Sequence, residues 1–174
     1  HFLQVFEACF NVLLTDKNLK DFLIQYLKEK RTPEHLALCK QFFDTHFDRL
    51  DSDDKVDFLS FFIVAFRSVN VGENKMKETF VKFEPLYGTA KPRNKLVIVS
   101  VEPASKFFGI ERIWAMYKRT DSKRLYTELS RLIARIYLQP EFADNESLAV
   151  YNDQKQSLFQ TALQMFMEAT TVSC

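Results

Sequence analysis

Three residues of one predicted helix carry side chains that can bind a metal ion or act as a nucleophile. His35, Cys39 and His46 are separated so that a helix places them on one face. A zinc site needs three or four ligands held by supporting groups, whereas Cys39 also continues an apolar stripe and Phe43 falls between the histidines. We therefore expect a buried Cys39 with histidines at the surface, and no metal site.

The other chemical motifs are incomplete. A nucleophilic Cys39 would need an exposed, electropositive pocket and an orienting third group, which nothing in the sequence specifies. Asp51 and Asp53 resemble the opening of a calcium loop, but Phe62 stands where the loop needs its bidentate Glu. Three glycines are too few for a phosphate-binding cradle. We predict a protein without catalytic residues or a cofactor, which is therefore not an enzyme.

Length and composition predict one all-helical domain. The 174 residues, 47% of them hydrophobic, are enough to bury one core, so a single domain over 1–174 is expected. Only three Gly and five Pro are present, too few for the many tight turns of a sandwich or barrel. The chain starts within a helical pattern and is expected to be a fragment of a longer protein.

Charge and cysteine usage limit the environment and the partners. The formal net charge is +1, so there is no general attraction to a polyanion, and nucleic acid is not expected as a partner. Three cysteines without paired spacing favour a reducing compartment, and we expect the cytoplasm. No uninterrupted apolar run reaches the roughly 18 residues of a membrane-spanning helix.

Apolar residues recur at helical spacing along most of the chain. The clearest start is Thr32 as N-cap, Pro33 at the first helical position and Glu34 at the positive helix end. A second cap is expected at Asp121 or Ser122, and Pro140 ends the helix that follows. The predicted helices cover residues 2–14, 19–27, 33–47, 56–66, 76–83, 103–117, 125–136 and 145–167.

The segment Leu96–Val101 has the composition of a strand. It has no second run to pair with, so we interpret it as an extended loop. The predicted fold is therefore all-α, a single helical bundle without a significant sheet.

A basic group lies on or near two successive predicted helices. Its members are Arg112, Lys118, Arg119, Lys123, Arg124, Arg131 and Arg135. Acidic residues interleave poorly there, so contact with acidic lipid is one reading, but a solvated face is favoured.

The order of elements resembles the regulator of G-protein signalling (RGS) homology domain, a bundle of about nine helices that binds G-protein α subunits (Gα). Thr32–Leu36 is similar to the start of the family helix that opens with Glu-Asn, with His35 in place of Asn. Lys75–Phe83 followed by Ala90–Leu96 resembles the helix before the family's Ala-Pro-Xaa-Xaa-Asn loop, and Leu125–Tyr151 resembles the closing helix pair. The resemblance covers about 10–151, with residues 152–170 as a C-terminal helical extension.

The resemblance implies activation of a partner's GTPase without a donated catalytic residue. Gα supplies its own arginine and glutamine, and the domain holds the switch loops in their transition-state arrangement. The implied partner-binding residues are Glu34, His35, Asn94, Arg135, Asp144 and Asn145. Asn94 would be the loop asparagine that contacts the switch region, while an ordinary turn asparagine is the alternative.

Two other functions stay open from the sequence. One is a helical docking scaffold that binds proteins without activating a GTPase. The other is a peripheral binder of the plasma membrane that uses the basic group, for which steep salt dependence is expected.

Overall fold

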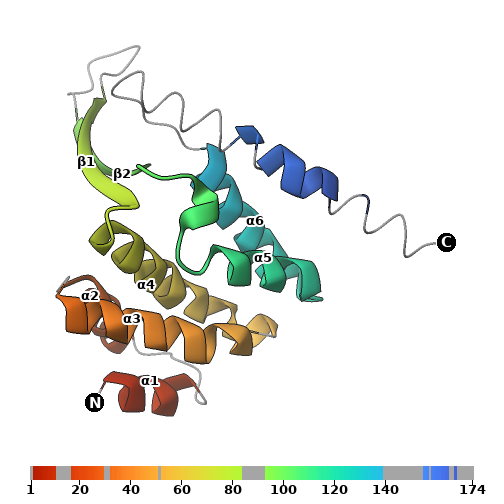
Figure 1. The fold of residues 1–174 in the computed structure, drawn as a ribbon. Coiled ribbons are helices and arrows are strands. Elements are labelled where there is room, and N and C mark those ends of the chain that lie inside the picture. The colour runs from red at the N-terminus through yellow and green to blue at the C-terminus, as the bar shows by residue number, and fades with distance from the viewer. Residues whose placement is uncertain are drawn as a thin grey trace. The chain divides into compact units, whose positions relative to one another are not determined.

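The residues that the structure describes are mostly helical and include a small two-stranded sheet (Figure 1). The structure is a computed structural model that describes residues 2–10, 17–29, 32–50, 52–83, 93–138, 155–156, 158–164 and 167. In chain order the elements are α1 (Phe2–Phe10), α2 (Lys17–Glu29), α3 (Pro33–His46), the 3-10 helices η1 (Phe47–Arg49) and η2 (Asp53–Phe58), α4 (Leu59–Gly72), β1 (Met76–Phe83), β2 (Arg93–Ser100), the 3-10 helix η3 (Ala104–Lys106), α5 (Ile110–Arg119) and α6 (Lys123–Leu138). The helical character predicted from the sequence is confirmed, while the nine-helix arrangement stays a prediction.

The chain divides into two compact units. The first unit contains His1–Asn74 and Phe108–Ile133, and the second contains Lys75–Phe107 and Ala134–Cys174. The single domain expected over 1–174 stays a prediction. The break predicted at Pro140 and the cap predicted at Asn145 lie outside the described residues.

Phenyl rings form the centre of the first unit. The Phe6 side chain of α1 is fully buried, and its ring centroid lies 4.5 Å from Phe42 of α3 in an edge-on contact. Phe42 in turn stacks on Phe62 of α4 at 4.8 Å. Offset and edge-on pairs are the favoured geometries of aromatic rings. The apolar stripes of three helices therefore meet in one core, with α1 lying against α3 (Figure 1).

Two helix starts follow the local chemistry expected of them. The Thr32 hydroxyl accepts a hydrogen bond from the His35 N–H at 3.3 Å, and Pro33 occupies the first turn of α3. The Ser122 hydroxyl accepts from the Leu125 N–H at 3.0 Å at the start of α6. Both caps satisfy N–H groups that have no partner inside their helix. The predictions at Thr32 and Ser122 are confirmed.

A buried amide joins α4 to the turn that precedes α5. The Asn70 side chain is fully buried, accepts from the Phe108 N–H at 2.8 Å and donates to the carbonyls of Phe66 and Phe108 at 2.8 and 3.2 Å. Gly109 follows with φ 78°, and a Cβ there would lie 3.0 Å from the Phe43 ring. The sequence predicted a helix from residue 103. The turn at Phe108 and Gly109 precedes α5, which therefore starts at Ile110.

The segment predicted as a helix over 76–83 is a strand, and so is most of the segment predicted as a loop over 96–101. β1 and β2 form an antiparallel pair over eight residues each, from Met76 opposite Ser100 to Phe83 opposite Arg93. Met76, Phe80 and Phe83 fit a helical period by chance. The partner segment supplies the backbone hydrogen bonds that a strand needs, and local spacing cannot reveal it.

We expect Asn70→Ala to lower the free energy of unfolding by about 2 to 3 kcal/mol, because it leaves the buried Phe108 N–H without an acceptor. Gln41→Ala, at an exposed position of α3, should change it by less than about 0.5 kcal/mol. Urea denaturation followed by circular dichroism measures both. Equal midpoints for the two variants would contradict the role given to Asn70.

Candidate partner-binding surface

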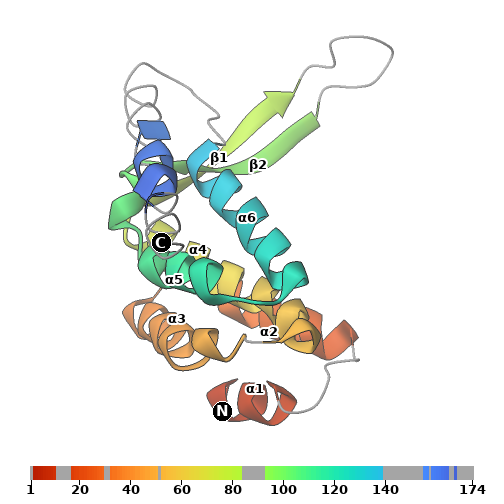
Figure 2. The ribbon, with the colours of Figure 1, turned by 90° about the vertical axis from the view of Figure 1, so that its right-hand side faces the viewer.

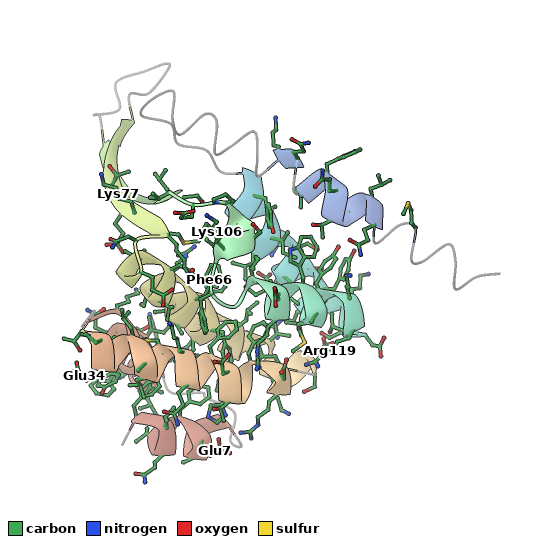
Figure 3. The ribbon with its side chains drawn as sticks, in the orientation of Figure 1. Glu7, Glu34, Phe66, Lys77, Lys106 and Arg119 are labelled. Atoms are coloured by element: carbon green, nitrogen blue, oxygen red, sulfur yellow. The ribbon has the colours of Figure 1, made fainter. Side chains whose placement is uncertain are left out.

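The start of α3 carries the first two residues that the family resemblance implies. Glu34 is exposed at the positive end of the helix (Figure 3). Hydrogen bonds from its own backbone N–H and from the Thr32 hydroxyl lower the pKa of the Glu34 carboxyl. The carboxylate therefore stays charged at neutral pH and is available at the surface.

His35 lies inside the first unit, so the surface position expected for it is wrong. Its side chain is only 8% exposed, and its Nε2 lies 3.1 Å from the Leu27 carbonyl of α2. Ser68 of α4 donates to the same carbonyl at 2.8 Å. The Leu27 carbonyl lies in the last turn of α2, where no N–H group of the same helix can donate to it. The His35 and Ser68 side chains supply the hydrogen-bond partners that it lacks. His35 thus joins α2 to α3 and offers little surface to a partner.

Cys39 is fully buried, as the sequence predicts. Burial raises the pKa of its thiol to about 11, which keeps the thiol protonated at neutral pH. The His35 Nε2 lies 3.6 Å from Sγ, while His46 contacts Glu7 and Arg49 instead. Among the residues that the structure describes, no group of three or more metal-ligating side chains comes together.

The remaining residues of the implied surface belong to the second unit or lie outside the described residues. Asn94 is the second residue of β2 and pairs with Lys82 of β1, so the loop position expected for it is wrong. Arg135 is exposed on α6. Asp144 and Asn145 lie outside the described ranges. Glu34 and His35 are neighbours on one helix, whereas Asn94 belongs to the hairpin.

Two aromatic residues of α2 are exposed beside the start of α3. Phe22 is 64% exposed and Tyr26, one turn later, is 40% exposed. The Tyr26 ring stacks on Phe2 of α1 at 5.1 Å and lies 5.9 Å from the His35 ring. We call Phe22, Tyr26 and Glu34 the α2–α3 surface. Aromatic side chains are enriched among the central contacts of protein interfaces.

On the helix predicted over 19–27, helical spacing puts Phe22 and Tyr26 on the same side as Leu23 and Leu27. The buried stripe of α2 is made of Leu23 and Leu27 instead. An apolar stripe that contains Phe22 and Tyr26 as well as Leu23 and Leu27 is wide. One neighbouring helix does not have to cover all of it. That excess width is the signal in the sequence that could have predicted an exposed aromatic pair.

The basic group on α5 and α6 is partly paired with aspartates from distant helices. Arg112 and Arg119 both contact Asp48, each at 3.0 Å. Arg124 contacts Asp57 at 2.6 Å. The sequence of α5 and α6 has few interleaving acids, and η1 and η2 supply Asp48 and Asp57 as partners instead. Each pair is exposed and contributes less than about 1 kcal/mol, but together the pairs reduce the positive field.

A histidine, a carboxylate and a guanidinium meet where α1 contacts the end of α3. Arg49 donates to both carboxylate oxygens of Glu7 at 2.8 Å, and the His46 Nδ1 lies 3.3 Å from Glu7 Oε2. Burial lowers the pKa of His46 below its usual 6.5, opposed by the Glu7 carboxylate and assisted by Arg49. The Arg49 hydrogen bond, with smaller contributions from the Arg49 and His46 charges, lowers the pKa of Glu7.

Comparisons with known proteins find no match for this chain. No family model matches the sequence, no curated protein matches it, and no solved structure matches the fold. Among the described residues, no helix is both long and apolar enough to cross a membrane.

We expect the free energy of unfolding to fall as the pH is lowered from about 7.5 to about 5.5, because unfolded His46 takes up a proton more readily than buried His46. A lowered pKa in the folded state means that this contribution is complete above 6.5 and is lost as the pH falls below it. His46→Gln should flatten the profile of urea midpoints against pH. An unchanged slope in this variant would show that other groups cause the pH dependence.

Proposed function

We propose that this chain is a protein-binding domain whose α2–α3 surface docks a partner, without an active site of its own. The observation that carries the proposal is the exposed pair of aromatic rings, Phe22 and Tyr26, one helical turn apart on α2. Tyr26 is held in place by stacking on Phe2, so it loses little conformational entropy when it is covered.

The partner that we propose is Gα, and this rests on the RGS resemblance. Supporting it, α3 begins at Thr32–Glu34, where the resemblance requires a helix start, and Glu34 is exposed beside Tyr26's helix. Bound to the switch loops of Gα, the domain would favour their transition-state arrangement and accelerate GTP hydrolysis by Gα's own residues. The resemblance assigns Asn94 a hydrogen bond to the switch region, but its position in β2 instead of a loop counts against that role.

A docking scaffold without GTPase-activating activity is the second candidate. The antiparallel pairing of Met76–Phe83 with Arg93–Ser100 favours it, because the resemblance requires a helix and a loop in this part of the chain. A basic face for acidic lipid has less support, since Arg112, Arg119 and Arg124 all contact aspartates.

We expect the wild-type chain to capture Gα loaded with GDP and aluminium fluoride in preference to Gα loaded with GDP alone. Phe22→Ala should weaken this capture about tenfold, since the variant removes an exposed anchor without disturbing the core. Gln25→Ala, at a neighbouring exposed position, is the matched control. Undiminished capture by Phe22→Ala would rule out the α2–α3 surface, and no capture by the wild type would rule out Gα.

Single-turnover GTP hydrolysis separates the activator from the scaffold. If the chain activates Gα through Asn94, Asn94→Ala should reduce the acceleration by about tenfold. Gln41→Ala should leave it unchanged, and circular dichroism checks that both variants are folded. Capture without acceleration would establish the scaffold, while acceleration that survives Asn94→Ala would remove the role of Asn94 and keep the activator.

A further inference from the structure

Two tyrosine rings meet where α6 follows α5. Tyr117 lies near the end of α5 and Tyr126 near the start of α6, and residues 120–122 join the two helices (Figure 2). The ring centroids are 4.5 Å apart, and the ring planes differ by 23°. The Tyr117 hydroxyl donates a hydrogen bond to the Tyr126 hydroxyl at 2.6 Å. The hydroxyl ends of the two rings are therefore in direct contact.

Neighbouring groups hold the two rings in this arrangement. The Trp114 ring packs edge-on against the Tyr117 ring, with centroids 5.7 Å apart and planes at 89°. The start of α6 is fixed by the cap at Ser122, and the Leu125 side chain, next to Tyr126 in the sequence, is fully buried. Both tyrosines therefore project from anchored helix ends and meet in the folded chain.

The pair can be reached from solvent. Tyr126 is 46% exposed, and Tyr117 is half-buried. Tyr26 of α2 is also exposed, but its ring stacks on Phe2, and Tyr137 is buried. Solvent access and contact with a second tyrosine thus come together at Tyr117 and Tyr126.

We propose that Tyr117 and Tyr126 form an oxidative modification site, where two one-electron oxidations join the rings through a carbon–carbon bond. The product is dityrosine, which links α5 to α6 within one chain. The oxidant is a haem peroxidase that is supplied with hydrogen peroxide. This inference uses neither the α2–α3 surface nor the proposed function.

The reaction removes two electrons and two protons from the pair. The oxidised peroxidase takes one electron from each phenol, and each hydroxyl releases its proton to water. The unpaired electron of each phenoxyl radical is shared with the ring carbons beside the C–O bond, and one such carbon from each ring forms the new bond. The hydrogen on each bonded carbon then moves as a proton to the phenol oxygen, which restores both aromatic rings. Hydrogen peroxide accepts the two electrons and two protons and becomes two water molecules.

Contact in the folded state favours a link within one chain. Two groups that are held together react without the entropy cost of an encounter, whereas coupling through Tyr26 requires two chains to collide. A carbon–carbon bond is not cleaved by thiols, so the link persists where a disulfide would be reduced. The modification is therefore a lasting record of exposure to peroxide.

The test treats the full chain with hydrogen peroxide and a haem peroxidase at neutral pH. We expect the fluorescence of a biphenol, which single tyrosines lack, in a monomer whose mass is lower by two hydrogen atoms. Trypsin should then release Ile113–Lys118 covalently linked to Leu125–Arg131, since a Lys or Arg precedes and ends each peptide. The link restricts the unfolded chain as a disulfide does, so the urea midpoint of the oxidised chain should rise.

Conservative variants show which rings react. Tyr117→Phe and Tyr126→Phe each remove one hydroxyl and keep the ring, and either change should abolish the biphenol fluorescence and the linked peptides. Tyr26→Phe, at an exposed position of α2, is the matched control and should leave both signals unchanged. Circular dichroism checks that the three variants are folded.

Three results would overturn the proposal. Linked peptides that persist in Tyr117→Phe would place the reaction at other tyrosines. Covalent dimers joined through Tyr26, without the internal link, would show that collision governs the coupling. Oxygen added to Trp114 or to methionines, with no link between the two tyrosines, would show that the pair is not the oxidised site. None of these results bears on Gα capture, which Phe22→Ala tests separately.

Discussion

Contact between phenyl rings from α1, α3 and α4 is the interaction on which the first unit depends. Phe6 comes from a helix of only nine residues, too short to be stable alone in water. Its fully buried ring against Phe42 and Phe62 supplies about 2 to 3 kcal/mol of apolar burial, and this holds α1 in place. Hydrogen bonds from Arg49 to both carboxylate oxygens of Glu7 also connect α1 to η1.

A polar joint complements this core. Because Ser68 and His35 both reach the Leu27 carbonyl, the last turn of α2 is tied to α3 and α4 at one point. The same turn carries Tyr26. Tyr26 therefore lies in a turn whose position is fixed by buried hydrogen bonds, and a preorganised side chain of this kind favours binding.

Features that arise from neighbouring residues could be predicted from the sequence. The caps at Thr32 and Ser122 follow from side chains that reach N–H groups three residues ahead, and the burial of Cys39 follows from its stripe. What failed involves partners distant in sequence. Asp48, which pairs with both Arg112 and Arg119, lies 64 and 71 residues away from them. The buried His35 ring contacts a carbonyl of another helix.

The sheet was not predicted for the same reason. A strand depends on the partner with which it pairs, and the spacing of its own apolar residues does not reveal that partner. The candidate surface was predicted in part. Glu34 is at the surface as expected, whereas the prominence of Phe22 depends on how much of α2 its neighbours cover. Asp144 and Asn145 lie outside the described residues, so their role stays a prediction from the sequence.

The inert state of Cys39 makes it an internal reporter of opening. A thiol with no exposed surface and a pKa near 11 reacts with alkylating reagents only when α3 separates from its neighbours. The rate of its modification at neutral pH therefore follows the population of that open form. A ligand that holds α2 against α3 would slow this reaction. The rate of Cys39 modification would therefore report binding at the α2–α3 surface without any added label.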